Sequence, residues 1–278
     1  MIFILGIDAL DYELVEKLNL NNLKQLEHDK IVVPINKEKG IPLSPEVWAS
    51  FLTGRDISID FKKQPMRDLL VKTNNFLNID FSKGFLKRIK YFYIENFVSA
   101  RRFGDLKQKT FLDITKSYEI NVPFYSFDNK TFDIGYLFGL EKLSLTQSIN
   151  ELQAVYEKRK RQIINEIKYM KNSDVVFSFM HTLDMLQHLS YLRFSEIKKQ
   201  YLDLDNYVSI LKNKLEDSFV EITFIIVSDH GFDINIGNHS NYAFYSSNTH
   251  LKPKPKRITD FYEIILELIE KNNGLSRS

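Results

Sequence analysis

Three short apolar runs in this chain are each followed closely by a carboxylate, and this arrangement constrains the fold more than any other feature. The runs cover residues 2–7, 175–180 and 220–228, and the carboxylates are Asp8, Asp184 and Asp229. Further strands are predicted at 31–35 and 242–247. Helical spacing of apolar residues predicts helices between the runs, at 11–27, 45–53, 148–171, 195–217 and 258–271. Alternating strands and helices indicate an α/β fold, with a mostly parallel sheet sandwiched by helices.

Histidines accompany the same carboxylates. His188 follows Asp184 by four residues, His230 follows Asp229 directly, and His239 lies nine residues further on. Because parallel strands end at one edge of a sheet, where open α/β sheets keep their sites, we expect these side chains to converge. Imidazole nitrogen with carboxylate oxygen suits zinc or manganese. The chain has no cysteine, which excludes thiolate ligands, disulfides and a cysteine nucleophile.

Composition divides the chain into a core and an insertion. Its 278 residues, 44% of them hydrophobic, suffice for a full core. Residues 60–109 hold 12 lysines and arginines against 5 acidic residues, a local net charge of +7, together with nine Phe and Tyr. This basic, aromatic stretch interrupts the alternation of strands and helices. We therefore predict an α/β metal-binding core formed by residues 1–57 and 146–278, with an inserted cap region at 58–145.

The sequence predicts a cytoplasmic protein. No apolar run approaches the roughly 20 residues of a membrane span. The N-terminus lacks the basic segment of a signal peptide and reaches Asp8 early.

Each candidate also has a purely structural interpretation. Ser44 before Pro45 is a good N-cap and first-turn pair, although the same geometry directs a helix N-terminus toward a phosphoryl group. Asp8 could cap the helix that follows it. Asp184 and His188 could form a surface pair on one helical face. The pair of Asp229 and a histidine at a strand end is poor core material, which favours a binding site.

Taken together, the motifs resemble the alkaline phosphatase superfamily, most closely its branch of type I phosphodiesterases and nucleotide pyrophosphatases. The resemblance covers both flanks of the predicted insertion. The matching pieces are Gly6-Ile7-Asp8-Ala9, residues 42–54 around Ser44, Asp184-Met185-Leu186-Gln187-His188, Ser228-Asp229-His230-Gly231 and Gly237-Asn238-His239.

The resemblance implies a catalytic centre with two divalent metal ions, zinc first and manganese second. It implies one metal held by Asp8, Ser44, Asp229 and His230, and a second held by Asp184, His188 and His239. It further implies that Ser44 is the nucleophile, because a nearby cation favours the alkoxide of a serine hydroxyl. The expected intermediate is a phosphoserine, which water then hydrolyses.

The sequence departs from the family pattern in ways that leave the substrate open. Ser44 stands where many relatives have threonine, and residues 55–58 lack the histidine-glycine pair of many phosphodiesterases. The family's asparagine for a phosphoryl oxygen has no match at its expected place. A sulfatase is disfavoured because Pro45 directly follows Ser44 and no arginine precedes Arg55. A phosphodiesterase or nucleotide pyrophosphatase is the leading hypothesis. The alternatives are a phosphomonoesterase, a cofactor-independent phosphosugar mutase and a catalytically silent binding protein.

Substrate recognition is predicted to involve the insertion. The expected substrate is a small phosphorylated molecule, a nucleotide or another phosphodiester. Aromatic rings could stack on a base, and the candidate substrate-binding residues are His181, Lys87, Arg88, Arg101 and Arg102. Two other interpretations stay open: an aromatic cap core with solvated lysines, or a basic amphipathic helix at 85–103 on an anionic membrane. No nucleic-acid-binding fold is recognised, and the sequence does not predict the oligomeric state.

Overall fold

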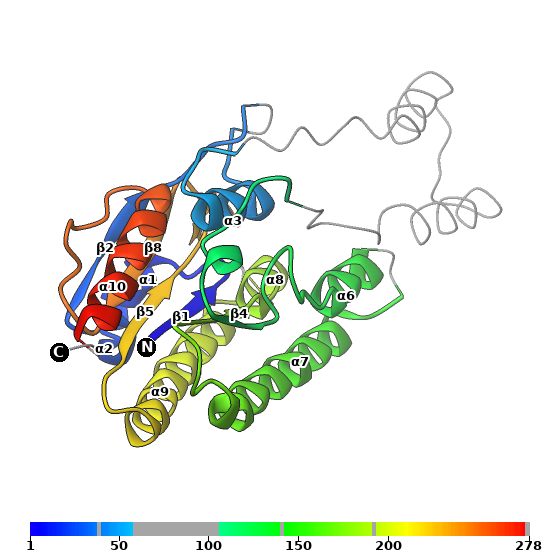
Figure 1. The fold of residues 1–278 in the computed structure, drawn as a ribbon. Helices are drawn as coiled ribbons and strands as arrows, with labels where there is room; N and C mark the ends of the chain where they lie inside the picture. The colour runs from blue at the N-terminus through cyan, green and yellow to red at the C-terminus, as the bar shows by residue number, and fades with distance from the viewer. Residues whose placement is uncertain (38–39, 58–105, 140–141, 191–192, 276–278) are drawn as a thin grey trace.

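The computed structural model describes residues 1–37, 40–57, 106–139, 142–190 and 193–275 (Figure 1). Its centre is a six-stranded sheet in the order β2-β8-β5-β1-β4-β3. The strands are β1 (Ile2–Ile7), β2 (Glu27–Val32), β3 (Ser117–Ile120), β4 (Val175–Met180), β5 (Thr223–Val227) and β8 (Tyr242–Ser247). β1 pairs in parallel with β4 and β5, and β3 pairs in parallel with β4, whereas β8 is antiparallel to both of its neighbours. The predicted mostly parallel sheet is confirmed.

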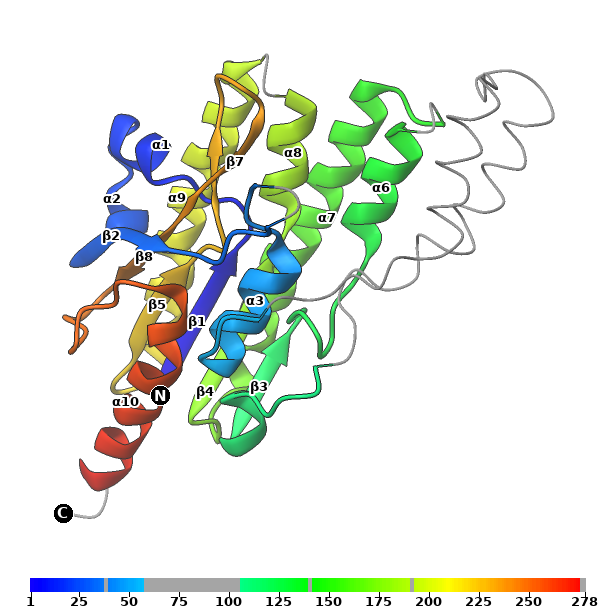
Figure 2. The same ribbon diagram turned by 90° about the horizontal axis from the view of Figure 1, so that it is seen from above.

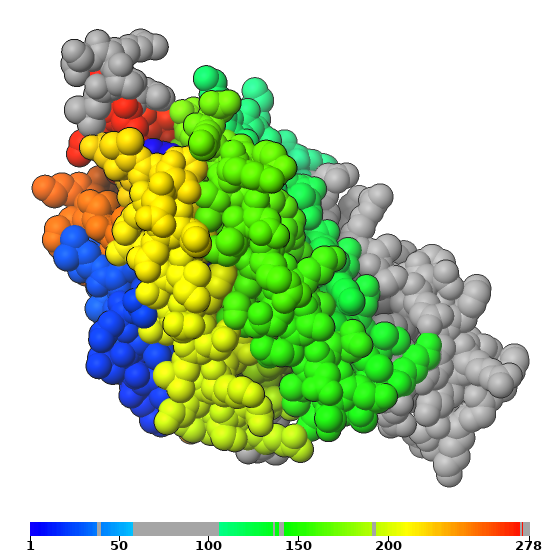
Figure 3. Space-filling model, turned by 90° about the horizontal axis from the view of Figure 1, so that it is seen from below, coloured from blue at the N-terminus to red at the C-terminus, as the bar shows by residue number. Residues whose placement is uncertain are grey.

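Helices cover both faces of the sheet, as the view from above shows (Figure 2). They are α1 (Tyr12–Lys17), α2 (Asn21–Lys24), α3 (Ser44–Thr53), α6 (Lys130–Gly139), α7 (Leu145–Glu166), α8 (Thr182–Ser190), α9 (Phe194–Ser218) and α10 (Phe261–Leu275). Short 3-10 turns cover Leu112–Ile114, Ile167–Tyr169 and Ile258–Asp260. α7 and α9 lie side by side over one face, green and yellow in Figure 3, and α3 and α10 pack on the other. A separate hairpin is formed by β6 (Gly231–Asp233) and β7 (Asn238–Ser240).

The alternation of side chains along β1 builds both layers of the core. Phe3 and Leu5 pack toward α9, whereas Ile2 and Ile4 pack toward α3 and α10. Gly6 lies where α3 approaches the sheet, since a Cβ there would be 2.8 Å from the Phe177 ring and 3.0 Å from the Trp48 ring. The close approach of buried Trp48 fixes α3, and with it the helix start at Ser44, against the end of β1.

Two predicted elements near the N-terminus differ from the structure. The helix expected at 11–27 is two short helices, α1 and α2, because Asn19 between them has a φ of 51°. Such a left-handed residue cannot continue a right-handed helix. The strand expected at 31–35 is instead β2 at Glu27–Val32, which pairs with β8 along its full length. Most of its side chains are polar and half-buried, so a search for apolar runs does not detect this strand.

The C-terminal boundary of the predicted insertion lies earlier in the sequence than residue 145. β3, inside the expected range 58–145, is an edge strand of the main sheet, and α6 packs on α7 and α8 through Ile134. Residues 106–139 are therefore part of the α/β body. β3 has only four residues, and they are a mixture of polar and apolar types, so its sequence gives little indication of a strand. The prediction, which relied on composition, therefore assigned it to the insertion. The remaining stretch, 58–105, lies outside the described residues.

In the described part of the chain, no helix combines the length and apolar character that crossing a membrane requires.

Candidate metal centre

The seven predicted ligand residues come from five segments that meet at one edge of the sheet. Asp8 directly follows β1, Asp229 lies two residues after the end of β5, and Asp184 lies in the first turn of α8, which follows β4. Ser44 is the first residue of α3, and His239 lies on the β6–β7 hairpin. β1 lies between β4 and β5, so three neighbouring parallel strands deliver carboxylates to the same place.

The first group of side chains surrounds the Nε2 atom of His230. This atom lies 3.5 Å from Asp8 Oδ1, 3.4 Å from Asp229 Oδ2 and 3.3 Å from the Ser44 hydroxyl. The Ser44 hydroxyl also lies 3.5 Å from Asp8 Oδ1. Asp8, Asp229 and His230 are all buried, and their ligand atoms lie within 4.8 Å of one another. The structure brings together all four residues predicted for the first metal.

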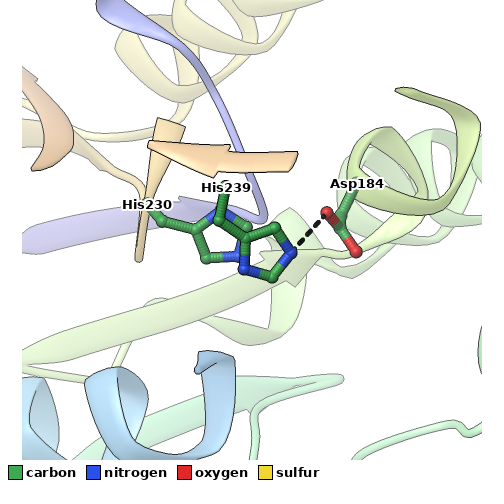
Figure 4. A group of neighbouring side chains, drawn as sticks. All are labelled: Asp184, His230 and His239. Atoms are coloured by element: carbon green, nitrogen blue, oxygen red, sulfur yellow. Dashed lines mark ion pairs between the residues drawn. The ribbon is translucent and has the colours of Figure 1, made fainter. Parts of the chain in front are cut away.

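The second group surrounds Asp184. Its Oδ1 atom lies 3.3 Å from His188 Nε2 and 3.6 Å from His239 Nε2, and the two histidine nitrogens are 3.1 Å apart. Figure 4 shows the ring of His239 directed toward the Asp184 carboxylate. All three predicted residues therefore meet, with His188 at the more exposed side of the group.

The two groups are contiguous through a pair of stacked rings. The imidazoles of His230 and His239 lie 3.7 Å apart between centroids, with an interplanar angle of 15°. Asp184, His230 and His239 also form a set of ligand atoms within 4.8 Å of one another (Figure 4). His230 therefore stands between the two predicted metal positions, whereas the sequence assigned it to the first alone.

The hydrogen bonds of these histidines prepare Nε2 as a ligand. His239 Nδ1 lies 3.0 Å from the Pro42 carbonyl, and His230 Nδ1 lies 3.0 Å from the Gly231 carbonyl. A carbonyl oxygen can only accept, so each Nδ1 carries the proton. In the neutral ring Nε2 then keeps its lone pair, which is the usual arrangement in metal-binding histidines.

Two buried carboxylate oxygens in the cluster lack a hydrogen-bond partner, Asp8 Oδ2 and Asp229 Oδ2. Native proteins rarely leave buried acceptors unsatisfied, because each costs about 1–3 kcal/mol. Cations placed among these oxygens and the Nε2 atoms would satisfy them. The donor set, carboxylate oxygen and imidazole nitrogen without sulfur, fits zinc or manganese.

The capping interpretations of Ser44 and Asp8 are wrong. The N-cap of α3 is Leu43, and the Ser44 hydroxyl is directed at Asp8 and His230 instead of at the helix backbone. The N-cap of α1 is Asp11, whose Oδ1 accepts the Leu14 N–H at 2.9 Å. The structure thus leaves both side chains to the cluster.

Asp11 is a residue that the sequence analysis missed. Its Oδ2 accepts the Phe232 N–H at 3.1 Å and the Tyr242 hydroxyl at 2.9 Å, so it ties the hairpin that carries His239 to the start of α1. The carboxylate comes so close to Gly231 that a Cβ there would lie 2.4 Å from it. Its position just before the first helical residue is a common N-cap signal that could have identified it, but nothing in the sequence indicates its contact with the hairpin.

His181 directly follows β4, and aromatic rings surround its side chain. Its ring is 4.7 Å from the Phe127 ring and is stacked on Phe179 at 5.8 Å, and Asn121 Nδ2 lies 3.2 Å from Nδ1. Nε2 is buried without a partner. Burial and the charge of Arg159 lower the pKa of His181 to about 3, so the ring is neutral.

The other predicted substrate residues lie outside the described part of the chain: Lys87, Arg88, Arg101 and Arg102.

The electrostatics of the cluster reflect carboxylates held close together. Burial, followed by the negative charges of Asp229 and Asp184, raises the pKa of Asp8 well above its usual range. Burial opposes ionisation of Asp184 as well, but the hydrogen bond and charge of His188 outweigh it and lower the pKa of Asp184. The same pairing raises the pKa of His188 against the effect of burial, while burial and the charge of His230 lower the pKa of His239.

The raised pKa of Asp8 predicts how stability of the metal-free protein depends on pH. The stabilising effect of its bound proton is complete below the unfolded pKa of about 3.9 and is lost as pH rises through the higher folded pKa. Asp8→Asn cannot suffer that loss. With chelator present, the unfolding free energy of the variant should therefore increase relative to that of wild type as pH rises, by at most about 1.4 kcal/mol per pH unit. Urea unfolding at several pH values measures the difference.

Asp29→Asn is the matched control. The hydrogen bond from Lys254 outweighs burial and lowers the pKa of Asp29, so this variant should lose stability relative to wild type as pH rises. If the unfolding free energies of Asp8→Asn and wild type changed with pH in the same way, the repulsion between Asp8 and the neighbouring carboxylates would be contradicted.

Fold and site define the chain as an α/β protein with a cluster of histidine and carboxylate side chains, which could hold metal ions, at the ends of its parallel strands. A profile of the family described as type I phosphodiesterase / nucleotide pyrophosphatase matches residues 108–254. The match spans more than half of the 278 residues, and the chain belongs to this family. The predicted branch of the alkaline phosphatase superfamily is thereby confirmed. Family membership supports assignment to the phosphoester hydrolases.

Solved structures resemble this chain at low sequence identity. The PH0037 protein from Pyrococcus horikoshii has a TM-score of 0.51 and 11% identity over 97% of this chain and 96% of its own, which shows a shared fold. Alkaline phosphatase from the Antarctic bacterium TAB5 has a TM-score of 0.47 and 11% identity, over 97% of each chain. Murine ectonucleotide pyrophosphatase/phosphodiesterase 5 has a TM-score of 0.44 and 14% identity over 83% of this chain and 57% of its own. The comparison with curated proteins found no match.

Proposed function

We propose that this protein is a phosphodiesterase or nucleotide pyrophosphatase that uses two divalent cations and a covalent phosphoserine on Ser44. One observation carries the proposal. The Ser44 hydroxyl lies 3.3 Å from His230 Nε2 and 3.5 Å from Asp8 Oδ1, at the border of a cluster whose buried carboxylate oxygens lack partners. A serine that served only the helix would have its hydroxyl on the backbone, not on a metal-ligand cluster.

The proposed ligands follow the two groups in the structure. Asp8, Ser44, Asp229 and His230 would hold one cation. Asp184, His188 and His239 would hold the other. Bound divalent cations would lower the pKa of the serine hydroxyl and neutralise charge on the phosphoryl oxygens. Zinc is the first candidate and manganese the second, because the donors are nitrogen and oxygen without sulfur.

The reaction then follows from the position of Ser44. Its Oγ forms a bond to phosphorus while the bond from phosphorus to the leaving oxygen breaks, which releases one alcohol and gives a phosphoserine that still carries the second ester group. Water next attacks the same phosphorus, the bond to Oγ breaks, and Ser44 is regenerated with release of a phosphate monoester. α3 begins at Ser44 and runs for 10 residues, so the positive end of its dipole faces the place where the phosphoryl oxygens would lie.

We also propose which residues contact the parts of the substrate other than its phosphoryl group. The basic and aromatic residues 60–109 suit an anionic substrate such as a nucleotide. His181 is kept as a candidate for substrate contact because its buried Nε2 has no partner. A catalytically silent binding protein is disfavoured, since every predicted ligand position is filled by a competent side chain. The cytoplasmic location stays a prediction.

Matched aryl phosphate esters test the preference for diesters. With zinc or manganese, purified protein should cleave the aryl diester with a kcat/KM at least about tenfold above that for the monoester, which corresponds to about 1.4 kcal/mol of transition-state binding. A chelator should abolish both reactions, and returning the metal should restore them. A preference for the monoester would favour a phosphatase. Transfer of phosphate to another hydroxyl, without release, would favour a mutase. Bound metal without turnover of either ester would favour a binding role.

A further inference from the structure

The backbone of Ala9 forms hydrogen bonds toward both ligand groups: to Asp229, and to a side chain of α8, the helix that carries Asp184. Ala9 directly follows Asp8 and is fully buried, and its φ of 58° places a non-glycine residue in the left-handed region. Its N–H donates to Asp229 Oδ1 at 3.2 Å. That bond occupies one oxygen of Asp229, so the unpartnered oxygen Oδ2 is the one that faces His230 Nε2, at 3.4 Å.

The carbonyl of Ala9, which belongs to the next peptide group, is held by Gln187 and Tyr201. Gln187 Nε2 donates to the Ala9 carbonyl at 2.9 Å, and the Tyr201 hydroxyl donates to Gln187 Oε1 at 3.1 Å. The Tyr201 oxygen in turn accepts the Asp11 N–H at 2.9 Å. Gln187 and Tyr201 are both fully buried. A left-handed alanine persists only where its surroundings fix the peptide groups on both sides of it. Asp229 holds the first of these groups, and the two side chains hold the second.

The place of Gln187 in the sequence connects the two ligand groups. It lies on α8 immediately before His188 and three residues after Asp184, while the residue it holds, Ala9, adjoins Asp8 and donates to Asp229. Hydrogen bonds therefore connect α8 to the carboxylate that follows β5. Neither Gln187 nor Tyr201 was among the residues singled out as ligands.

We propose that Gln187 and Tyr201 are positioning residues that orient Asp229 through the backbone of Ala9 and couple the two cation sites. The inference rests on the proposed metal centre. Without the two side chains, Ala9 leaves its left-handed conformation and its N–H turns away from Asp229. The carboxylate then loses the orientation that leaves Oδ2 free for a cation. The Ala9 N–H is the direct hydrogen-bond partner of the ligand Asp229, and the loss of such a partner typically costs 10- to 100-fold in metal affinity.

Two variants and one control test the proposal. Tyr201→Phe removes a single oxygen, and Gln187→Met keeps the length of the side chain without its amide. Tyr207→Phe is the control. Tyr207 is also buried on α9, and its hydroxyl donates to the Lys160 carbonyl at 3.4 Å, away from the cluster. For each protein, Mn²⁺ affinity is measured by calorimetry, the visible spectrum is recorded with Co²⁺, and thermal unfolding is followed in chelator.

Gln187→Met should weaken Mn²⁺ binding by about 10- to 100-fold, and Tyr201→Phe should weaken it in the same direction by less. Both should shift the Co²⁺ spectrum, whereas Tyr207→Phe should leave affinity and spectrum unchanged. A purely structural role would lower the unfolding temperature of Tyr201→Phe and Tyr207→Phe alike, with wild-type affinity and spectrum in both, and that result would overturn the proposal. A wild-type protein that binds no metal would overturn the metal centre itself, so the two failures are distinguishable.

Discussion

Replacing Ser44 with alanine is expected to lower phosphodiester turnover by about 10³-fold or more, because alanine has no hydroxyl to form the covalent intermediate. The second cation group does not include Ser44, so its metal should be retained. The measurement is kcat/KM on an aryl diester, with metal content determined on the same sample. Wild-type metal content with lost turnover would assign Ser44 to the chemical step.

Two further variants make the Ser44 test specific. Ser44→Thr keeps a hydroxyl at the same place and should retain part of the turnover. Ser50→Ala removes another serine of α3, whose hydroxyl donates to the Glu46 carbonyl, and should leave the chemistry intact. Ser44→Ala with near-wild-type turnover would contradict a nucleophilic serine and would require attack by water directly on the substrate.

Replacing Asp229 with alanine should remove the first cation and abolish turnover. The variant deletes one of the three non-serine ligands of that group, so the loss of affinity should exceed the roughly 100-fold upper range for residues one shell further out. It also leaves the Ala9 N–H without its acceptor, at a cost of about 1–3 kcal/mol in unfolding free energy. That cost is partly offset, because the negative charge that helps raise the pKa of Asp8 is removed.

Calorimetric titration with Zn²⁺ and thermal unfolding with and without metal measure the effect of Asp229→Ala. Metal should raise the unfolding temperature of wild type and raise that of the variant much less. Asp29→Ala is a control for the loss of a carboxylate, since Asp29 pairs with Lys254 on the surface, away from the cluster. An Asp229→Ala protein that binds two cations and turns over substrate would refute the assignment of the site.

The sequence was sufficient to predict the convergence of the ligands. Asp8 and Asp229 directly end strand-like runs, and parallel strands deliver such residues to one edge of a sheet, so proximity followed from local signals. The shared position of His230 did not follow, because the stacking of His230 on His239 depends on how the β6–β7 hairpin folds back. A side chain at a strand end is predictable, but the path of a loop is not.

Contacts between distant segments account for what the sequence analysis missed. The conformation of Asn19 interrupts a segment whose apolar spacing is otherwise helical. β3 consists of four residues of mixed polarity. It forms a strand because it pairs with β4, and its sequence alone shows no strand pattern. The bond from Gln187 to Ala9 spans 178 positions, so nothing near either residue indicates it.

Anomalous diffraction from crystals grown with zinc would test the central claim most directly. The account predicts two zinc peaks in each molecule: one among Asp8, Ser44, Asp229 and His230, the other among Asp184, His188 and His239. Folded protein without zinc at these residues, or with zinc bound only elsewhere, would contradict a two-cation centre and the phosphodiesterase mechanism built on it.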